Sequence, residues 1–280
     1  MAMKPRGTFL RSGKVKDIYK LDDDHLLFYF TDRVSAFDVV LPSTIPRKGE
    51  VLCKLSAFWF ETLGVPHHMV STEGPNMMVV DTMTMIPVEC VVRGYLYGSL
   101  YDRLLRGEVS LPVDRVLAAK LPEPYFDPTT KSEVKDEPIT EAEIVREGRM
   151  SRFELDFVKG TTKSIFAKMS QRALGSGFIL ADLKLEFGRR EGSVLLGDSI
   201  GPDEFRMWPA ERYAPGKSQD SYDKQPVRDW LTGAGYKEKL DRARKSGEPT
   251  PPPPVLPPEL ISLVSDRYVH IYEVLTGRKL

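Results

Sequence analysis

Three charged residues alternate with apolar ones in the segment GFILADLKLEFGRREGSVLLGDS. In an extended strand, side chains two residues apart point to the same face, so Asp182, Lys184 and Glu186 would share one face. The glycines after this run indicate a turn and a second apolar strand that ends at Asp198. A hairpin centred near Gly192 would place Asp198 opposite Glu186, and one centred two residues earlier would place it opposite Asp182. Either register adds a third carboxylate to the charged face.

This charged face is compatible with two kinds of environment. Burying carboxylates and a lysine is costly unless other charges compensate them. A Mg²⁺ ion with a bound triphosphate would do so, because this cation takes one or two protein carboxylates and completes its octahedron with phosphate oxygens and water. The alternative is a solvent-exposed sheet face with a cross-strand Lys–Glu pair. The alternation alone does not decide between them.

Two lysines near the start of the chain are a second candidate for phosphate binding. Lys14 and Lys16 in SGKVK share a strand face, and Gly13 would allow a phosphate to approach the backbone. The segment matches neither GxGxxG nor the Walker pattern, so a pair of surface lysines fits it as well. The later loop TDRVSAFD adds Ser35 and Asp38. Such polar loop residues either bind small ligands or form an ordinary turn.

Further cationic side chains could hold anionic groups. Arg93 and Ser99 flank the turn GYLYG, where a guanidinium and a hydroxyl could bind a carboxylate or a phosphate. Lys224 and Arg228 lie one helical turn apart and could form a phosphate-binding wall with Arg206. Each of these residues could equally be half of a surface salt bridge.

The composition argues against several classes of protein. The 280 residues include 40 Lys and Arg against 40 Asp and Glu, so no net charge draws the chain to nucleic acid or to a membrane surface. No run approaches the ~20 apolar residues that cross a bilayer, and residues 1–20 lack a signal-peptide pattern, so we expect a cytoplasmic protein. Cys53 and Cys90 lack metal-ligand spacing, which favours reduced core thiols. The four histidines have no nucleophile motif beside them, which argues against triad catalysis and zinc chemistry.

The elements that would position these residues follow from periodicity and turn signals. The chain is long enough for one large domain or for two lobes that close over a cleft. The longest helix is expected from Ser151 to about Leu174, with Phe153 and Phe157 in its core face. Residues 121–138 and 197–219 are expected to be loops. The other expected elements are a hairpin over 13–32, a helix over 50–63, strands over 77–81 and 87–95, short helices over 99–106, 226–231 and 236–245, a proline-rich linker over 249–258 and a terminal helix over 259–276. The linker is either a stiff spacer or a polyproline II ligand.

Six blocks of this sequence together resemble one family. They are GKVKDIY, TDRVSAFDVVLPSTIPRKGEVLCKLSAFWF, PVECVVRGYLYGSL, ADLKLEFG, LGDSIGPDEFRMW and GKSQDSYDKQPVRDWL. In their order, and over roughly residues 13–231, they are similar to phosphoribosylaminoimidazole-succinocarboxamide synthases (SAICAR synthetases) of purine biosynthesis. Long blocks in a fixed order are far more specific than any single motif among them.

The resemblance implies an ATP- and Mg²⁺-dependent ligase. Such an enzyme joins the carboxylate of carboxyaminoimidazole ribotide (CAIR) to the amino group of L-aspartate through an acyl phosphate and releases ADP and phosphate. The implied fold is a two-lobed α+β structure, with a β-rich N-terminal lobe over 1–81, a larger mixed α/β lobe over 82–280 and ATP in the cleft between them. The implied partners are small-molecule substrates rather than nucleic acid or membrane, and a homodimer stays open.

The resemblance also implies roles for the residues that match the family's motifs. Glu186 and Asp198 are expected to bind Mg²⁺. The other expected roles are phosphate contacts of ATP for Lys14 and Lys16, the adenine pocket for Met85, catalysis beside the phosphates for Lys184 and Asp182, the active-site loop for Lys131 and Asp136, the carboxylate or ring of CAIR for Arg93 and Ser99, its ribose phosphate for Arg206, Lys224 and Arg228, and aspartate and CAIR for Ser35 and Asp38.

One departure from the family's pattern concerns the metal. The family commonly has Asp-Glu where this chain has Asp198-Ser199. Ser199 would leave one charge fewer around the metal, so the number of Mg²⁺ ions and the tightness of their binding stay open. A kinase-like phosphotransferase that uses the same ATP cleft is the second hypothesis. An interaction protein that presents its proline run is the third.

Overall fold

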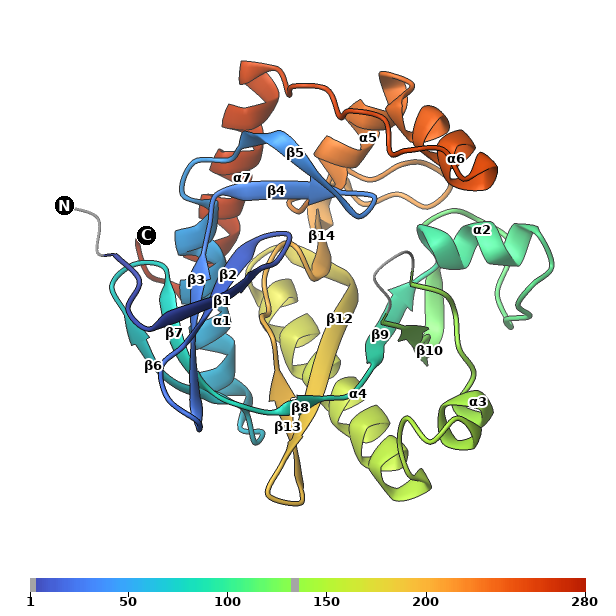
Figure 1. Ribbon diagram of the computed structural model, residues 1–280. Helices are drawn as coiled ribbons and strands as arrows, with labels where there is room; N and C mark the ends of the chain where they lie inside the picture. The colour runs from blue at the N-terminus through green and yellow to red at the C-terminus, as the bar shows by residue number, and fades with distance from the viewer. Residues whose placement is uncertain (1–3, 132–135) are drawn as a thin grey trace.

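The computed structural model describes residues 4–131 and 136–280 and has the expected α+β class (Figure 1). Its strands are β1 (Thr8–Ser12), β2 (Lys16–Lys20), β3 (His25–Phe30), β4 (Arg33–Ala36), β5 (Val39–Thr44), β6 (Met69–Glu73), β7 (Met77–Asp81), β8 (Thr84–Met85), β9 (Val88–Tyr95), β10 (Lys120–Phe126), β11 (Thr129–Thr130), β12 (Phe178–Arg190), β13 (Ser193–Gly197) and β14 (Phe205–Pro209). Its helices are α1 (Lys48–Leu63), α2 (Ser99–Leu105), α3 (Glu141–Arg146), α4 (Arg152–Gly175), α5 (Gln225–Gly233), α6 (Tyr236–Ser246) and α7 (Pro258–Thr276), with a 3₁₀ turn at Ala210–Arg212.

The N-terminal sheet has the strand order β1-β2-β3-β7-β6, and neighbouring strands are antiparallel. The expected hairpin over 13–32 is formed by β2 and β3, in which Lys16 lies opposite Phe30. Lys16 and Ile18 are the buried residues of β2, so both point to the inner face of the sheet. Helix α1 packs against β3 and spans Lys48–Leu63, with Gly64 as its C-cap, close to the expected bounds.

The second sheet is built around β12, which pairs with β8, β9, β13 and β14. Helix α4 packs against β12 and β9. The β12–β13 turn consists of Glu191 and Gly192, whose φ angles of 51° and 76° suit a two-residue hairpin turn. Glu186 lies opposite Gly197, so Asp198 is one residue beyond the position opposite Glu186. The turn near Gly192 is confirmed, but the expected pairing of Asp198 with Glu186 is wrong by one residue, because Gly197 takes that position.

The first two phenylalanines of α4 do not belong to the core. Phe153 is 82% exposed and Phe157 is 41% exposed, so their expected burial is wrong. The buried stripe of α4 consists of Leu155, Val158, Thr162, Ile165, Phe166, Met169 and Ala173. At 3.6 residues per turn, Phe153 lies more than half a turn from Leu155 and therefore faces away from the sheet.

Two segments that were expected to be loops contain strands. β10 occupies residues 120–126, although its sequence KLPEPYF contains two prolines. It lies at the edge of the second sheet, the place where a strand tolerates proline. β14 occupies residues 205–209 and pairs with β12, so Asp182 lies opposite Arg206. These strands are defined by the strand beside them rather than by their own pattern.

The proline-rich linker and the terminal helix pack onto the rest of the chain. Leu256 in the linker is buried, and its backbone N–H donates to the hydroxyl of Ser43 in β5 at 2.8 Å. α7 packs against α1. These contacts favour the spacer interpretation of the linker. None of the helices within 4–131 and 136–280 is long and apolar enough to span a membrane.

Candidate active site

A cavity of about 640 Å³ is lined by residues of both large sheets. Fifteen of the sixteen site residues expected from the sequence line it, namely Lys14, Lys16, Ser35, Asp38, Arg93, Ser99, Lys131, Asp136, Asp182, Lys184, Glu186, Asp198, Arg206, Lys224 and Arg228. Met85 does not line this cavity but lies on β8, paired with Gly188. The fold thus gathers residues that are more than 200 positions apart in the chain into one polar pocket.

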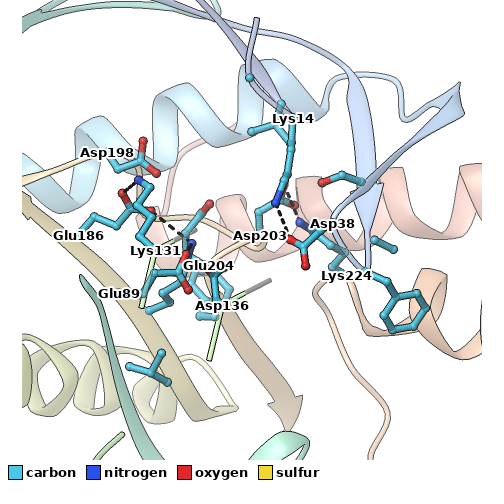
Figure 2. Close-up of a pocket in the computed structure, with 18 of the residues that line it drawn as sticks. Lys14, Asp38, Glu89, Lys131, Asp136, Glu186, Asp198, Asp203, Glu204 and Lys224 are labelled. Carbon is cyan, nitrogen blue, oxygen red and sulfur yellow. Dashed lines mark hydrogen bonds and ion pairs between the residues drawn. The ribbon is translucent and has the colours of Figure 1, made fainter. Parts of the chain in front are cut away.

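One part of the cavity holds three acids and three lysines, several of which are labelled in Figure 2. This acid–lysine cluster consists of Glu89, Glu186, Asp198, Lys16, Lys131 and Lys184. Glu186 accepts hydrogen bonds from Lys131 and, at 3.4 Å, from Lys184. Lys184 also donates to Glu89 on the neighbouring strand β9 at 2.6 Å. Lys16, which points inward from β2, donates to Asp198. The alternation of β12 therefore faces a charged cavity rather than open solvent.

The charges in this cluster stabilise one another. Burial favours the neutral form of Asp198, but Lys16 and Lys131 lower its pKa below the usual range. Burial also opposes the charged form of Lys184, yet its two carboxylate neighbours raise its pKa well above the usual value. The pKa of Lys131 is raised in the same way, by Glu186 against burial. These groups are therefore ionised at neutral pH.

The backbone at Asp198 adopts a left-handed conformation, with φ of 59°. Its carbonyl lies 3.2 Å from Nε2 of His68. Burial, with Lys16 second, lowers the pKa of His68 to about 4, so the ring is neutral and its N–H donates to this carbonyl. The next residue, Ser199, is buried and accepts a hydrogen bond from Lys16 at 3.3 Å. Ser199 therefore adds a hydrogen-bonding group beside Asp198 but no charge.

Glu186 and Asp198 suit a Mg²⁺ ion that phosphate oxygens would help to hold. Among residues 4–131 and 136–280, no group of three or more His, Cys, Asp or Glu side chains could hold a metal ion. Two carboxylates are enough for Mg²⁺ when phosphate and water supply the other ligands. Both carboxylates already contact ammonium groups, those of Lys131 and Lys16, so the place accommodates positive charge.

A second group of charged residues lies where β9, β12 and β14 meet. Arg93 donates from Nε to Asp127 at 2.6 Å and from Nη2 to Ser99 at 3.0 Å. Arg206 donates to Asp182, its partner across the β12–β14 pair. Asp182 thus shares a strand face with Lys184 but is neutralised by arginine. Arginines held in this way present their remaining N–H groups in fixed directions.

Gly98 lets the turn between β9 and α2 approach Arg206. Its φ is 57°, a conformation that glycine adopts without strain. A Cβ atom at this position would lie 2.9 Å from Nη2 of Arg206. The second glycine of the GYLYG turn therefore brings Ser99, the first residue of α2, close to both arginines of the cavity.

Asp203 links Lys224 to the protein interior. The ammonium group of Lys48 donates to Oδ2 of Asp203 at 2.9 Å, and that of Lys224 lies 3.2 Å from the same oxygen. The hydroxyl of Tyr268 in α7 donates to Oδ1 at 2.8 Å. Burial would raise the pKa of Asp203, but Lys224 and Lys48 lower it. Burial lowers the pKa values of Lys224 and Arg228, and a bound anion would stabilise their charged forms.

One ion pair joins two turns at the N-terminal side of the cavity. Lys14 follows β1, Asp38 lies between β4 and β5, and their side chains meet at 2.5 Å (Figure 2). Ser35 in β4 is buried and also lines the cavity. Both partners of the pair are partly exposed, so this contact contributes little to stability and a ligand can replace it.

With this geometry described, comparison with known proteins identifies the family. The family model described as SAICAR synthetase matches residues 9–243. The chain belongs to the SAICAR synthetase family. A phosphoribosylaminoimidazole-succinocarboxamide synthase of Nitrosopumilus maritimus is 51% identical to it, over 97% of this chain and 99% of that protein.

Solved structures of SAICAR synthetases share this fold. A SAICAR-synthase from Saccharomyces cerevisiae complexed with SAICAR is 32% identical, with a TM-score of 0.83 over 97% of this chain and 95% of that one. A SAICAR synthetase in complex with ADP is 28% identical, with a TM-score of 0.74 over 96% of this chain and 98% of that one. The chain is therefore an enzyme of this family with the family's two-lobed α+β fold.

The charged residues around this SAICAR synthetase's cavity that were not expected from the sequence include Lys48, Glu89, Asp203 and Glu204. Asp203 and Glu204 fall inside the block LGDSIGPDEFRMW, so their place in that block was an available signal. Glu89 lies in the strand block PVECVVRG between apolar neighbours, and no charged residue nearby in the sequence indicates an ion-pair partner for it. Nothing in the local sequence distinguishes Lys48 from an exposed lysine at a helix start, since its partner Asp203 is 155 residues away.

Proposed function

We propose that this chain joins the carboxylate of CAIR to the amino group of L-aspartate, with ATP and Mg²⁺, to give SAICAR, ADP and phosphate in de novo purine biosynthesis. The observation that carries this proposal is the cavity itself, which combines the acid–lysine cluster with a separate set of cations, Arg206, Lys224 and Arg228. The first suits phosphoryl transfer, and the second suits a substrate phosphate. SAICAR and ADP, present in the two related structures described above, are products of this reaction.

The acid–lysine cluster would carry the first chemical step. A carboxylate is a poor electrophile, so its oxygen first takes the γ-phosphoryl group of ATP and becomes a leaving group. Lys16, Lys131 and Lys184 would exchange carboxylate partners for phosphate oxygens and neutralise the transferring group. Mg²⁺ held by Glu186 and Asp198 would supply further charge neutralisation for the phosphates. The lysines start as ion pairs, so their positive charges are already positioned when the nucleotide binds.

The cations near β14 would hold CAIR. Arg206, Lys224 and Arg228 would bind its ribose phosphate, and Arg93 and Ser99 would lie near its ring or carboxylate. Holding the carboxylate beside the phosphoryl donor converts a reaction between two dissolved molecules into one within a single complex. The amine of aspartate then displaces phosphate from the acyl phosphate. We place this reaction in the cytoplasm.

A coupled assay of ADP release tests the proposal. We expect ADP release to require CAIR and L-aspartate together, with SAICAR detected as the product by mass spectrometry. ADP release with CAIR alone, accompanied by a stable phosphorylated product, would instead identify a kinase-like phosphotransferase. Absence of nucleotide turnover, together with partner capture that depends on residues 250–258, would favour an interaction protein.

A further inference from the structure

Glu204 is an acid of the cavity to which the proposed reaction has so far given no role. It follows Asp203 and comes directly before β14, in the segment between Asp198 and Arg206. Its side chain lines the cavity. In Figure 2 it lies between Lys131 and Glu186 on one side and Lys224 on the other. Glu204 therefore stands between the proposed nucleotide and ribose-phosphate subsites.

The backbone of Glu204 is fixed on both sides. Its carbonyl accepts a hydrogen bond from the N–H of Lys184 at 2.8 Å, and its own N–H donates to the carbonyl of Gly201 at 2.9 Å. Its Oε2 accepts from the N–H of Gly201 at 2.9 Å. The side chain is thus anchored through one oxygen to a turn whose position is set by the central strand β12.

The carboxylate of Glu204 differs from its neighbours in its partners. Six other acids of the cavity each contact a lysine or arginine, namely Asp38, Glu89, Asp182, Glu186, Asp198 and Asp203. Within 4–131 and 136–280, Glu204 forms no ion pair with a lysine or an arginine. Its Oε2 is hydrogen-bonded to Gly201, whereas its Oε1 has no hydrogen-bond partner among the same residues. One oxygen of a rigidly held carboxyl group is therefore available to a ligand.

The surroundings make this carboxyl group a good proton acceptor. Burial comes first among the causes that raise the pKa of Glu204, to about 8, and the charges of Asp203 and Asp198 act in the same direction. Lys184 and Lys224 oppose the shift. A carboxyl group with this pKa is mostly protonated at pH 7, and its ionised form, the one that accepts a proton, is a much stronger base than an ordinary glutamate.

The charges of the proposed substrates leave one partner for such a group. ATP and CAIR present phosphates and a carboxylate, which the lysines and arginines of the cavity would bind. L-Aspartate brings the one cationic, proton-donating group among the substrates, its ammonium. We propose that Glu204 binds the amino group of L-aspartate and accepts its proton as the amine attacks. This inference rests on the ligase function proposed above.

The step balances without any further reagent. The ammonium group gives one proton to the carboxylate of Glu204, which frees the nitrogen lone pair. That lone pair forms the C–N bond to the acyl carbon, and the C–O bond to the phosphoryl group breaks. Phosphate leaves with the electron pair of that bond and takes up the second proton of the nitrogen. Glu204 later releases its proton to solvent.

The substitution Glu204→Gln tests this role because it keeps the shape of the side chain but cannot accept the proton. We expect kcat/KM for L-aspartate to fall by about 100-fold or more, the usual contribution of a positioned acid or base. The KM values for ATP and CAIR should stay close to those of the unsubstituted enzyme. Glu204→Asp, which retains a carboxylate, should recover part of the activity. Glu248→Gln, on the exposed segment before the proline run, is the matched control and should change nothing.

Hydroxylamine separates this role from a structural one. It is largely uncharged at neutral pH, so it can attack an acyl phosphate without giving a proton to the protein first. The Gln variant should form the hydroxamate of CAIR, with ATP, about as well as the unsubstituted enzyme, which also shows that it folds. Equal losses with both nucleophiles, or unchanged kinetics with aspartate, would overturn the role of Glu204 alone. An unsubstituted enzyme that makes no SAICAR would instead refute the ligase proposal, and the inference with it.

Discussion

Asp198 and Asp203 lie five residues apart, and lysines lower the pKa of both, yet their surroundings differ. Asp198 forms an ion pair with Lys16 and lies close to Lys131. Lys131 directly follows the short strand β11, and its side chain is 42% exposed. Asp203 is held between Lys224 and Lys48, and the Lys48 side chain is completely buried. The first arrangement can open to admit a ligand, whereas the second fixes the wall of the cavity. Under the proposed function, similar ion pairs would thus serve exchange with a ligand in one place and rigidity in the other.

The largest effect on turnover should come from removing a carboxylate charge in the acid–lysine cluster. Asp198→Asn or Glu186→Gln should lower Mg²⁺-dependent turnover by about 100-fold or more, because a catalytic metal contributes several kcal/mol to the stabilisation of the transition state. The measurement is the rate of ADP release against Mg²⁺ concentration. Glu191→Gln, at the exposed tip of the same hairpin, is the control and should leave the rate unchanged. Near-normal rates in both cavity variants would refute the metal assignment.

A substitution at the buried ion pairs of Asp203 should affect the stability of the fold rather than the dependence on metal. Lys48→Met should lower the free energy of unfolding by about 3 kcal/mol, because it removes one partner of a buried ion pair. Urea denaturation measures this loss. Lys54→Met on the same helix breaks a partly exposed pair with Glu50 and should cost less than about 1 kcal/mol. Equal losses in the two variants would show that the buried pair has no special structural role.

Lys224 combines the two roles, because it contacts the buried Asp203 and also lines the cavity where a ligand would bind. Lys224→Ala should raise KM for CAIR by about 10-fold or more with a smaller change in kcat, because a phosphate contact is shared by the ground state and the transition state. Steady-state kinetics with CAIR varied give both constants. Lys217→Ala, an exposed lysine earlier in the same block, is the control. An unchanged KM would exclude Lys224 from the phosphate site.

Local alternation explains why much of the site was predictable. The strand period placed Lys184 and Glu186 on one face, and glycine turn chemistry located the hairpin that brings Asp198 beside them. The family resemblance extended this to cations on other elements, such as Arg93 and Lys224. The two-lobed α+β fold was predicted from the family resemblance, and periodicity predicted several of its helices and strands.

The remaining features depend on contacts between distant parts of the chain. β10 and β14 are strands because β9 and β12 offer them a pairing edge, so their own sequences suggested loops. Phe153 looked like a core residue because it is apolar, but the face of α4 that packs inward is set by the sheet. The Lys48–Asp203 pair links residues that no sequence spacing relates. Such features follow from tertiary packing rather than from local pattern.

The smallest effect concerns an ion pair on the same central strand but outside the cavity. Arg189, near the end of β12, donates a hydrogen bond to Glu154 in the first turn of α4. This bond, together with a second one from the backbone N–H of Ser151, lowers the pKa of Glu154 to about 2. A carboxyl group with a lowered pKa stabilises the folded state above its ordinary value of 4.5, and this contribution disappears as the pH falls towards 2. Glu154→Gln should therefore be less stable than the unsubstituted protein by about 1 kcal/mol at pH 7, and the difference should vanish in acid. Urea denaturation at several pH values measures this, with Glu191→Gln as the exposed control. A difference that stays constant with pH would mean that the capping hydrogen bonds, rather than the charge of Glu154, provide the stability.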